Sequence, residues 1–159
     1  MAALCMNPGD TLPNLAVETD LGKAQLHDWR GQTLVLYFYP KDDTPGCTVE
    51  GQDFSRLHAE FLGLGCQVVG VSRDSVSSHE RFIAKHDLSI TLIADTSNAL
   101  CEALGVIKEK NMYGKTVLGI ERSTFLFNDK GVLHQAWRGV SVPGHAEAVL
   151  QAVKALTSH

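Results

Sequence analysis

The chain has 159 residues, of which 44% are hydrophobic and 20% are charged, with a formal net charge of −4. These values are typical of a soluble globular protein, and we expect one domain over residues 1–159. The mildly acidic balance excludes a basic surface for nucleic acid, and no apolar run approaches the ~20 residues of a membrane helix.

Apolar segments and turn signals alternate along the chain. The first half predicts an edge hairpin within 14–27, a buried strand over 34–39, a helix through Phe54, Leu57, Phe61 and Leu64, and a strand over 67–72. The second half predicts a helix that begins with a capping box of Ser77 and Glu80, a strand over 91–94, a helix near 97–104, a hairpin of 123–127 with 132–137, and a last helix through 146–156. This order predicts an α/β fold with a central mixed β-sheet flanked by helices.

The four cysteines are Cys5, Cys47, Cys66 and Cys101. They are too few for a secreted disulfide scaffold, and no pair has CxxC spacing, which excludes a zinc ribbon and a thioredoxin-type dithiol. The first ten residues, MAALCMNPGD, have no positive region followed by an apolar stretch, unlike a secretory signal. We therefore expect a cytoplasmic protein whose cysteines are thiols.

Cys47 stands where a buried strand and a turn-rich segment, KDDTPG, lead into a helix. A side chain in the first turn meets unpaired backbone N–H groups and the positive end of the helix dipole, and both stabilise an anion. The thiolate is the nucleophilic form of cysteine. Thr44 can offer a hydroxyl, and Gly46 lets backbone N–H groups approach a substrate closely. For an isolated cysteine the alternative is a small buried hydrophobic residue.

The residues around Cys47 favour the first interpretation. Residues 40–47 (PKDDTPGC) match the pattern PxxxTxxC in full, and 108–115 (KEKNMYGK) and 119–125 (GIERSTF) extend the likeness along the chain. The sequence resembles the peroxiredoxins, specifically their bacterioferritin comigratory protein (PrxQ-type) subfamily. The resemblance implies a thioredoxin-like fold and reduction of hydrogen peroxide and organic hydroperoxides through a sulfenic acid on Cys47.

The resemblance also implies roles for four other residues. Pro40 would shield the thiolate from solvent, and Thr44 would hydrogen-bond the sulfur and the peroxide. Arg122 would come from a neighbouring strand and polarise the peroxide, a role that suits a permanently charged, rigid fork of donors. Glu50 either orients Arg122 through a salt bridge or is a solvated glutamate on a helix face.

A sulfenic acid must be resolved by a second thiol before it oxidises further. Where relatives often carry the resolving cysteine, this chain has Gln52 and Ile83. Cys66 and Cys101 are interpreted as buried structural thiols. If a resolving cysteine exists in this chain, the candidates are Cys101, in spite of that interpretation, and Cys5. We favour a one-cysteine mechanism in which thioredoxin, glutaredoxin or glutathione supplies the thiol.

The remaining residues predict no further chemistry. The seven histidines include no HxxxH or HxH pair, so His79 and His86 are interpreted as surface or partly buried packing residues. No metal, haem or flavin is expected, because the sulfur itself reacts. The resemblance implies a monomer. The alternative function is a thioredoxin-fold redox sensor or binding module that passes oxidation to a partner protein.

Overall fold

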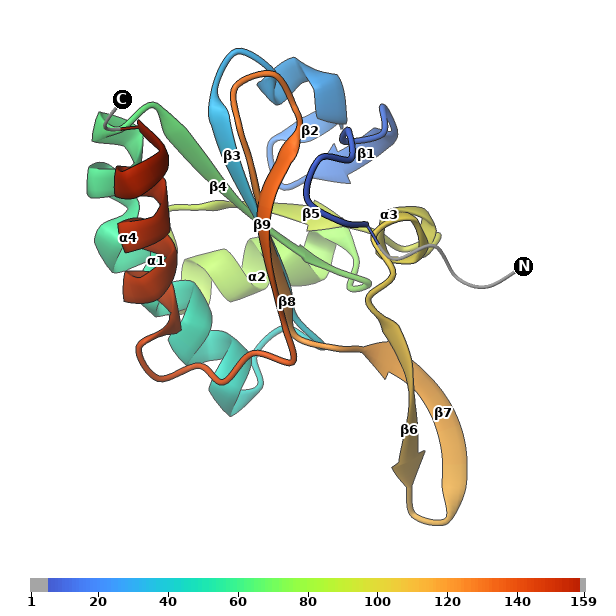
Figure 1. The fold of residues 1–159 in the computed structure, drawn as a ribbon. Coiled ribbons are helices and arrows are strands. Elements are labelled where there is room, and N and C mark those ends of the chain that lie inside the picture. Colours follow the sequence, from blue (N-terminus) through green and yellow to red (C-terminus); the bar gives the residue numbers. More distant parts are fainter. Residues whose placement is uncertain (1–5, 158–159) are drawn as a thin grey trace.

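The structure is a computed structural model that describes residues 6–157, and a mixed sheet forms its centre. The seven strands of this sheet in the described residues are β1 (Ala16–Thr19), β2 (Gly22–Gln25), β3 (Thr33–Phe38), β4 (Cys66–Ser72), β5 (Thr91–Ala94), β8 (Ser123–Phe127) and β9 (Leu133–Arg138). Their order is β2-β1-β5-β4-β3-β8-β9 (Figure 1). The central strands β3, β4 and β5 are parallel, whereas β8 is antiparallel to β3.

Helices cover both faces of this sheet. They are α1 (Pro45–Gly63), α2 (Val76–His86), α3 (Ala99–Ala103) and α4 (His145–Thr157), with a short 3-10 helix at Leu26–Trp29. α1 and α4 lie side by side (Figure 1) and share a buried cluster with α2, whereas α3 belongs to the cluster on the opposite face. The predicted α/β fold is confirmed. None of the described helices is long and apolar enough to cross a membrane.

β3 separates the two hydrophobic clusters of the protein. All of its residues are buried, as expected for a strand covered on both faces. Because side chains alternate along a strand, Leu34 and Leu36 belong to one cluster and Val35 belongs to the other. Cys101 is in the first cluster and Cys47 is in the second, so the sheet separates these two cysteines.

Most predicted elements are present with small shifts of their ends. The strand expected at 34–39 spans Thr33–Phe38, and the hairpin expected within 14–27 pairs β1 with β2 at the edge of the sheet. The prediction of a capping box formed by Ser77 and Glu80 is wrong. Ser75 caps α2 instead, since its side chain accepts a hydrogen bond from Ser78 N at 3.1 Å. A run of serines offers several capping hydroxyls, and the chain direction after β4 selects among them.

A second, two-stranded sheet was not predicted. β6 (Ile107–Met112) and β7 (Lys115–Ile120) form a hairpin that projects from the body of the protein (Figure 1). Tyr113 and Gly114 join them with φ of 53° and 79°, the two positive values that a type I′ turn requires. The hairpin escapes prediction because most of β7 is exposed and has no alternating apolar pattern, although Ile107 and Ile120 at its base contact the core.

We expect Phe54→Ala to lower the free energy of unfolding by about 3–5 kcal/mol, because the lost ring leaves a cavity. Phe54 is fully buried in α1 and stacks on Tyr37 with ring centroids 4.6 Å apart. Leu62→Ala is the control in the same helix, since Leu62 is 46% exposed, and we expect a change within about 0.5 kcal/mol. Urea unfolding measures both, and equal effects would contradict this account of the core.

Candidate active site

Cys47 lies in the first turn of α1, at the carboxyl edge of the parallel strands. The chain leaves β3 and turns through a short loop, and Thr44 is extended (φ −96°, ψ 154°) as the residue that precedes the helix. Pro45 is the first helical residue, where the missing N–H group would have no partner in any case. The Cys47 side chain is only 2% exposed. The thiol therefore lies in a nearly dry site at the positive end of a 19-residue helix.

Arg122 reaches the same place from the neighbouring strand. β8 pairs with β3 so that Ser123 is opposite Phe38, and this register puts the preceding residue beside the loop. Arg122 Nη2 donates a hydrogen bond to Cys47 Sγ at 3.4 Å. The arginine side chain is 17% exposed, so its charge acts with little screening by water.

Glu50 holds the other arm of this guanidinium. It follows Cys47 by one helical turn and is 1% exposed, and its Oε1 accepts from Arg122 Nη1 at 2.6 Å. Of the two interpretations of this residue, the structure has the salt bridge and not the solvated glutamate. Burial raises the pKa of Glu50 to about 7, although the charge and the hydrogen bond of Arg122 act in the opposite direction.

The loop before Cys47 differs in one respect from what the sequence predicts. Thr44 Oγ1 donates to the carbonyl of Lys41 at 2.8 Å, and no hydrogen bond joins it to the sulfur among the described contacts. Because a hydroxyl has one proton, its lone pairs stay available as acceptors. Gly46 leaves room for the guanidinium, since a Cβ there would lie 3.2 Å from Arg122 Nη2. Pro40 is partly buried in the loop that follows β3.

Cys101 is remote from this site. It is fully buried in α3, where its backbone N–H and that of Leu100 donate to the carboxylate of Asp95 at 2.8 and 3.1 Å. Burial raises the pKa of the Cys101 thiol well above its ordinary value. A disulfide needs Cα atoms within about 7 Å, whereas α3 and α1 lie on opposite faces of the sheet. Cys101 and Cys47 therefore cannot pair in this fold.

Cys66 is on the same face as Cys47 but at the other end of the strands. It is the first residue of β4 and pairs with Thr33, the first residue of β3. The seven residues of β4 span roughly 20 Å at about 3.3 Å per residue, so this thiol is far from the helix start. Burial raises its pKa to about 12. The other candidate, Cys5, lies outside the described residues.

A buried polar cluster behind the loop was missed by sequence reasoning. The interpretation of His79 as a surface or partly buried packing residue is wrong, because the side chain is fully buried and its Nδ1 lies 2.7 Å from Asp42 Oδ2. Asp42 also accepts hydrogen bonds from Tyr39 and Ser78, at 2.7 and 2.8 Å. His86 is partly buried, as interpreted. The available signal was an aspartate in the turn-rich loop that follows a buried strand, but nothing in the sequence identifies its partner 37 residues later.

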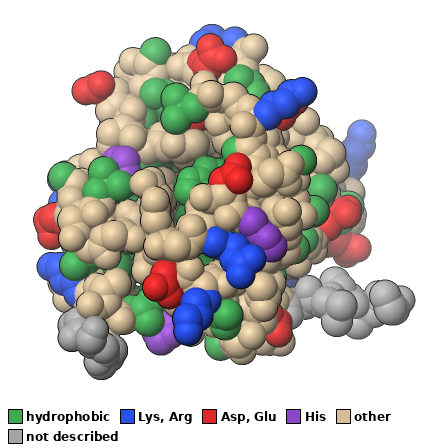
Figure 2. Space-filling view, turned by 90° about the horizontal axis from the view of Figure 1, so that it is seen from above, with side chains coloured by type: hydrophobic (Ala, Val, Ile, Leu, Met, Phe, Trp, Pro, Cys, Tyr) green, Lys and Arg blue, Asp and Glu red, His purple; other side chains and the backbone are tan. Residues whose placement is uncertain are grey.

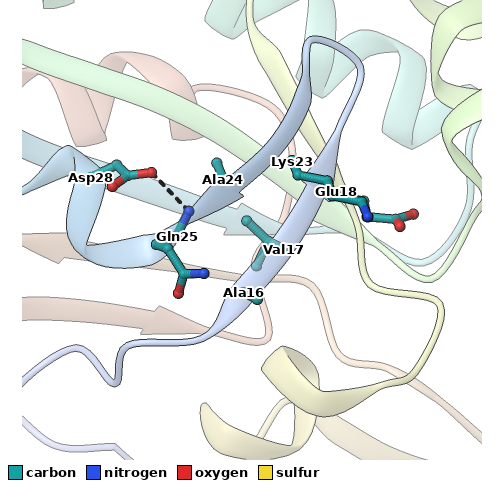
Figure 3. Close-up of a pocket in the computed structure, with 7 residues that line it drawn as sticks. All are labelled: Ala16, Val17, Glu18, Lys23, Ala24, Gln25 and Asp28. Atoms are coloured by element: carbon teal, nitrogen blue, oxygen red, sulfur yellow. Dashed lines mark hydrogen bonds between the residues drawn. The ribbon is translucent and has the colours of Figure 1, made fainter.

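Features elsewhere do not form a second catalytic site. A cavity of about 470 Å³ lies at the edge hairpin (Figure 3), and its one hydrogen-bonded carboxylate, Asp28, caps the backbone N–H of Gln25 at 2.8 Å. On the face seen in Figure 2, Lys and Arg side chains are interspersed with Asp and Glu. In the part of the chain that the structure describes, no three His, Cys, Asp or Glu side chains are grouped to hold a metal ion.

Comparison with known proteins gives a single family. Residues 8–136 match the model of the AhpC/TSA family. Peroxiredoxin Bcp of Xanthomonas campestris pv. campestris is 61% identical over 125 residues, which are 79% of this chain and 78% of that protein. Peroxiredoxin Bcp of Bacillus subtilis is 44% identical over 147 residues, 92% of this chain and 94% of that protein.

Solved structures agree with the sequence relatives. The bacterioferritin comigratory protein of Xanthomonas campestris, described with its alkyl peroxide reduction activity, superposes with a TM-score of 0.88 at 52% identity and covers 98% of this chain and 99% of its own. A mutant of PrxQ from Xylella fastidiosa superposes with a TM-score of 0.92 at 47% identity, over 96% of this chain and 98% of its own.

The chain therefore belongs to the AhpC/TSA family. Within it, the chain is a peroxiredoxin of the bacterioferritin comigratory protein (PrxQ-type) subfamily, and so a thiol-dependent peroxidase. The expected thioredoxin-like fold is confirmed by the same structures. The relatives reported above are all peroxiredoxins, and none of them supports the alternative of a redox sensor or binding module.

The buried Glu50 carboxyl predicts a pH dependence of stability. Burial raises the pKa of Glu50 in the folded state to about 7, whereas its ordinary pKa is 4.5. The folded state thus binds the extra proton between these values, and stability falls as the pH rises through them, by about 3 kcal/mol. Urea unfolding across this range should show the decline in the wild type and a shallower one in Glu50→Gln. Parallel curves for the two proteins would contradict the burial argument.

Proposed function

We propose that Cys47 is the residue that attacks the peroxide. The observation that carries the proposal is the 3.4 Å contact between Cys47 Sγ and Arg122 Nη2, in the first turn of α1. A fixed cation and the helix N-terminus both favour the thiolate, which is the nucleophilic form. The substrates are hydrogen peroxide and organic hydroperoxides.

The first step is a displacement at oxygen. The thiolate of Cys47 attacks the terminal oxygen of the hydroperoxide, an S–O bond forms and the O–O bond breaks. The sulfur is oxidised to a sulfenic acid, and the leaving alkoxide or hydroxide takes up a proton to become an alcohol or water. Negative charge moves from sulfur to the leaving oxygen, and a guanidinium held beside both atoms stabilises it along the path.

Three further residues support this step in the proposal. Glu50 takes one arm of Arg122 and thereby directs the other, Nη2, at the sulfur. The Thr44 hydroxyl donates its hydrogen bond to the Lys41 carbonyl, so its oxygen accepts a hydrogen bond from the peroxide and orients it. Pro40 covers the sulfur and limits access of water and bulky oxidants.

Resolution of the sulfenic acid is proposed to use an external thiol. No described cysteine lies within disulfide reach of Cys47, because Cys101 is across the sheet and Cys66 is at the far end of the strands. The external thiol attacks the sulfenic sulfur, water leaves, and a second thiol reduces the mixed disulfide. Glutathione, glutaredoxin or thioredoxin fits this role, in a monomer that works in the reducing cytoplasm.

We expect Cys47→Ser to abolish peroxide consumption, because a serine hydroxyl is not ionised at neutral pH and is a poor nucleophile towards oxygen. Cys66→Ser and Cys101→Ser are the matched controls, and both should retain the wild-type rate. The measurement is loss of hydrogen peroxide over time, with dithiothreitol as the reductant. Peroxide turnover by Cys47→Ser would contradict the assignment of Cys47 as the nucleophile.

We expect one equivalent of peroxide to leave a sulfenic acid on Cys47 and no disulfide between described cysteines. Intact-mass and peptide mass spectrometry after trapping with dimedone measures both. The control is Cys5→Ser, which should give the same adduct. A disulfide joining Cys47 to Cys5 would instead identify a resolving cysteine and contradict the one-cysteine mechanism.

A further inference from the structure

The loop that carries Pro40 and Thr44 is fixed to α2 by two consecutive aspartates. Asp43 accepts hydrogen bonds from Lys85 and His86, both at 2.7 Å, and is held at a φ of 59°. The Asp43 side chain is nearly half exposed in these contacts, so they contribute little to stability. Asp42, in contrast, is 7% exposed and turns into the protein. The buried anchor of the loop is therefore Asp42.

His79 is the charged partner of this anchor. Its ring is 0% exposed, and its two nitrogens contact Asp42 Oδ2 at 2.7 Å and the carbonyl oxygen of Ile93 at 2.8 Å. A carbonyl oxygen can only accept a hydrogen bond, so Nε2 must carry a proton. The ring thus joins the loop before α1 to β5, through a residue of α2.

The contacts of Asp42 indicate that Nδ1 carries a proton as well. Asp42 already accepts hydrogen bonds from the hydroxyls of Tyr39 and Ser78, so its two oxygens act as acceptors in this cluster. An ionised carboxylate has no proton to give to a neutral nitrogen. Both ring nitrogens are therefore donors, and His79 is a buried imidazolium paired with a buried carboxylate.

The surroundings of the ring support the charged form. The titratable groups that face it are Asp42 from the loop, Tyr39 from the end of β3 and Asp74 from the segment after β4. Burial lowers the pKa of His79, but the hydrogen bond and charge of Asp42, with smaller help from Ile93 and Asp74, outweigh it and raise the pKa above 6.5. Asp74 also accepts the backbone N–H of Asp42 at 2.9 Å.

We propose that His79 is a positioning residue of the peroxidase: as an imidazolium it holds Asp42, and through it the loop that sets Thr44 and Cys47 in place. This inference rests on the function proposed for Cys47. Thr44 donates to the carbonyl of Lys41, directly before Asp42, so a shift of the anchor moves the hydroxyl that faces the peroxide. His79 does not touch the substrate and acts through the loop alone.

The imidazolium predicts a definite pH dependence. A histidine with a raised pKa stabilises the fold fully below 6.5, and this stabilisation is lost as the pH rises through the raised value. Deprotonation leaves the carboxylate of Asp42 buried without a cation and next to Asp74. The loop then loosens, and the rate of peroxide attack falls on the alkaline side.

Nitrogen-15 NMR of the wild-type protein tests the charge state directly. The His79 ring should carry two protons at neutral pH and lose one above the pH at which a free histidine does so. A ring that carries a single proton at neutral pH would overturn the inference. This readout does not depend on activity and needs no variant that must fold.

Stopped-flow kinetics of the reduced protein with hydrogen peroxide tests the link to the reaction. We expect the His79→Gln variant to react about 10²-fold more slowly at neutral pH, since small displacements of reacting groups have effects of this size. It should also lack the alkaline decline of the wild type, because glutamine does not titrate. His134→Gln, at an exposed position of β9, is the matched control and should behave as wild type.

Two results would contradict the positioning role. One is a folded His79→Gln protein, judged by near-ultraviolet circular dichroism, that reacts at the wild-type rate. The other is a wild-type alkaline decline that does not coincide with the NMR titration of His79, a comparison that stands even if the variant does not fold. A wild-type protein that does not react with peroxide at any pH would instead refute the proposed function itself.

Discussion

One guanidinium, shared between a buried carboxyl and a thiol, is the interaction on which the candidate site depends. Arg122 gives one arm to Glu50 and the other to Cys47, in a place where both acceptors are almost fully buried. The pairing of β8 with β3 brings the arginine there, and the helix that starts after β3 brings the two acceptors. A buried cation would be costly without Glu50, and Glu50 would be costly without the cation. The fold therefore fixes three side chains that none of its local elements would hold alone.

The sheet also decides which thiols can react with one another. Alternation along β3 sends neighbouring residues into two separate clusters, with Cys47 in one and Cys101 in the other. The direction of the parallel strands separates Cys47 from Cys66 within a single cluster. Burial in apolar surroundings keeps both of these other thiols protonated, because it raises their pKa. The difference between a reactive and an inert cysteine thus follows from position in the fold.

The fold could be predicted well wherever a local pattern sets the structure. The buried strand β3, the edge hairpin and the hairpin of β8 with β9 follow from apolar runs and turn residues, whereas Arg122 was expected beside Cys47 only through the family resemblance. The predictions that failed concern features that depend on tertiary contacts. The burial of His79 results from a partner far along the chain, and the β6–β7 hairpin contacts the core only near its base among the described residues, so it has no alternating apolar pattern. The role of Glu50 could not be decided from the sequence, because the sequence does not show which side of α1 is buried.

Among the residues that the structure describes, no second cysteine lies within disulfide reach of Cys47, and the loop before Cys47 is fixed to α2 by the contact of Asp42 with His79. Structures of the peroxiredoxin Q of Xanthomonas campestris include serine mutants of two cysteines, separated along that chain as Cys47 and Ile83 are here. In this chain Ile83 packs against the cluster that contains Cys47, and Asp42 ties the loop to His79 in the same helix. In the proposed one-cysteine mechanism, an external thiol attacks the oxidised Cys47, and no cysteine from α2 takes part. The buried contact of Asp42 with His79, which fixes the loop to α2, is therefore compatible with the proposed resolution by an external thiol.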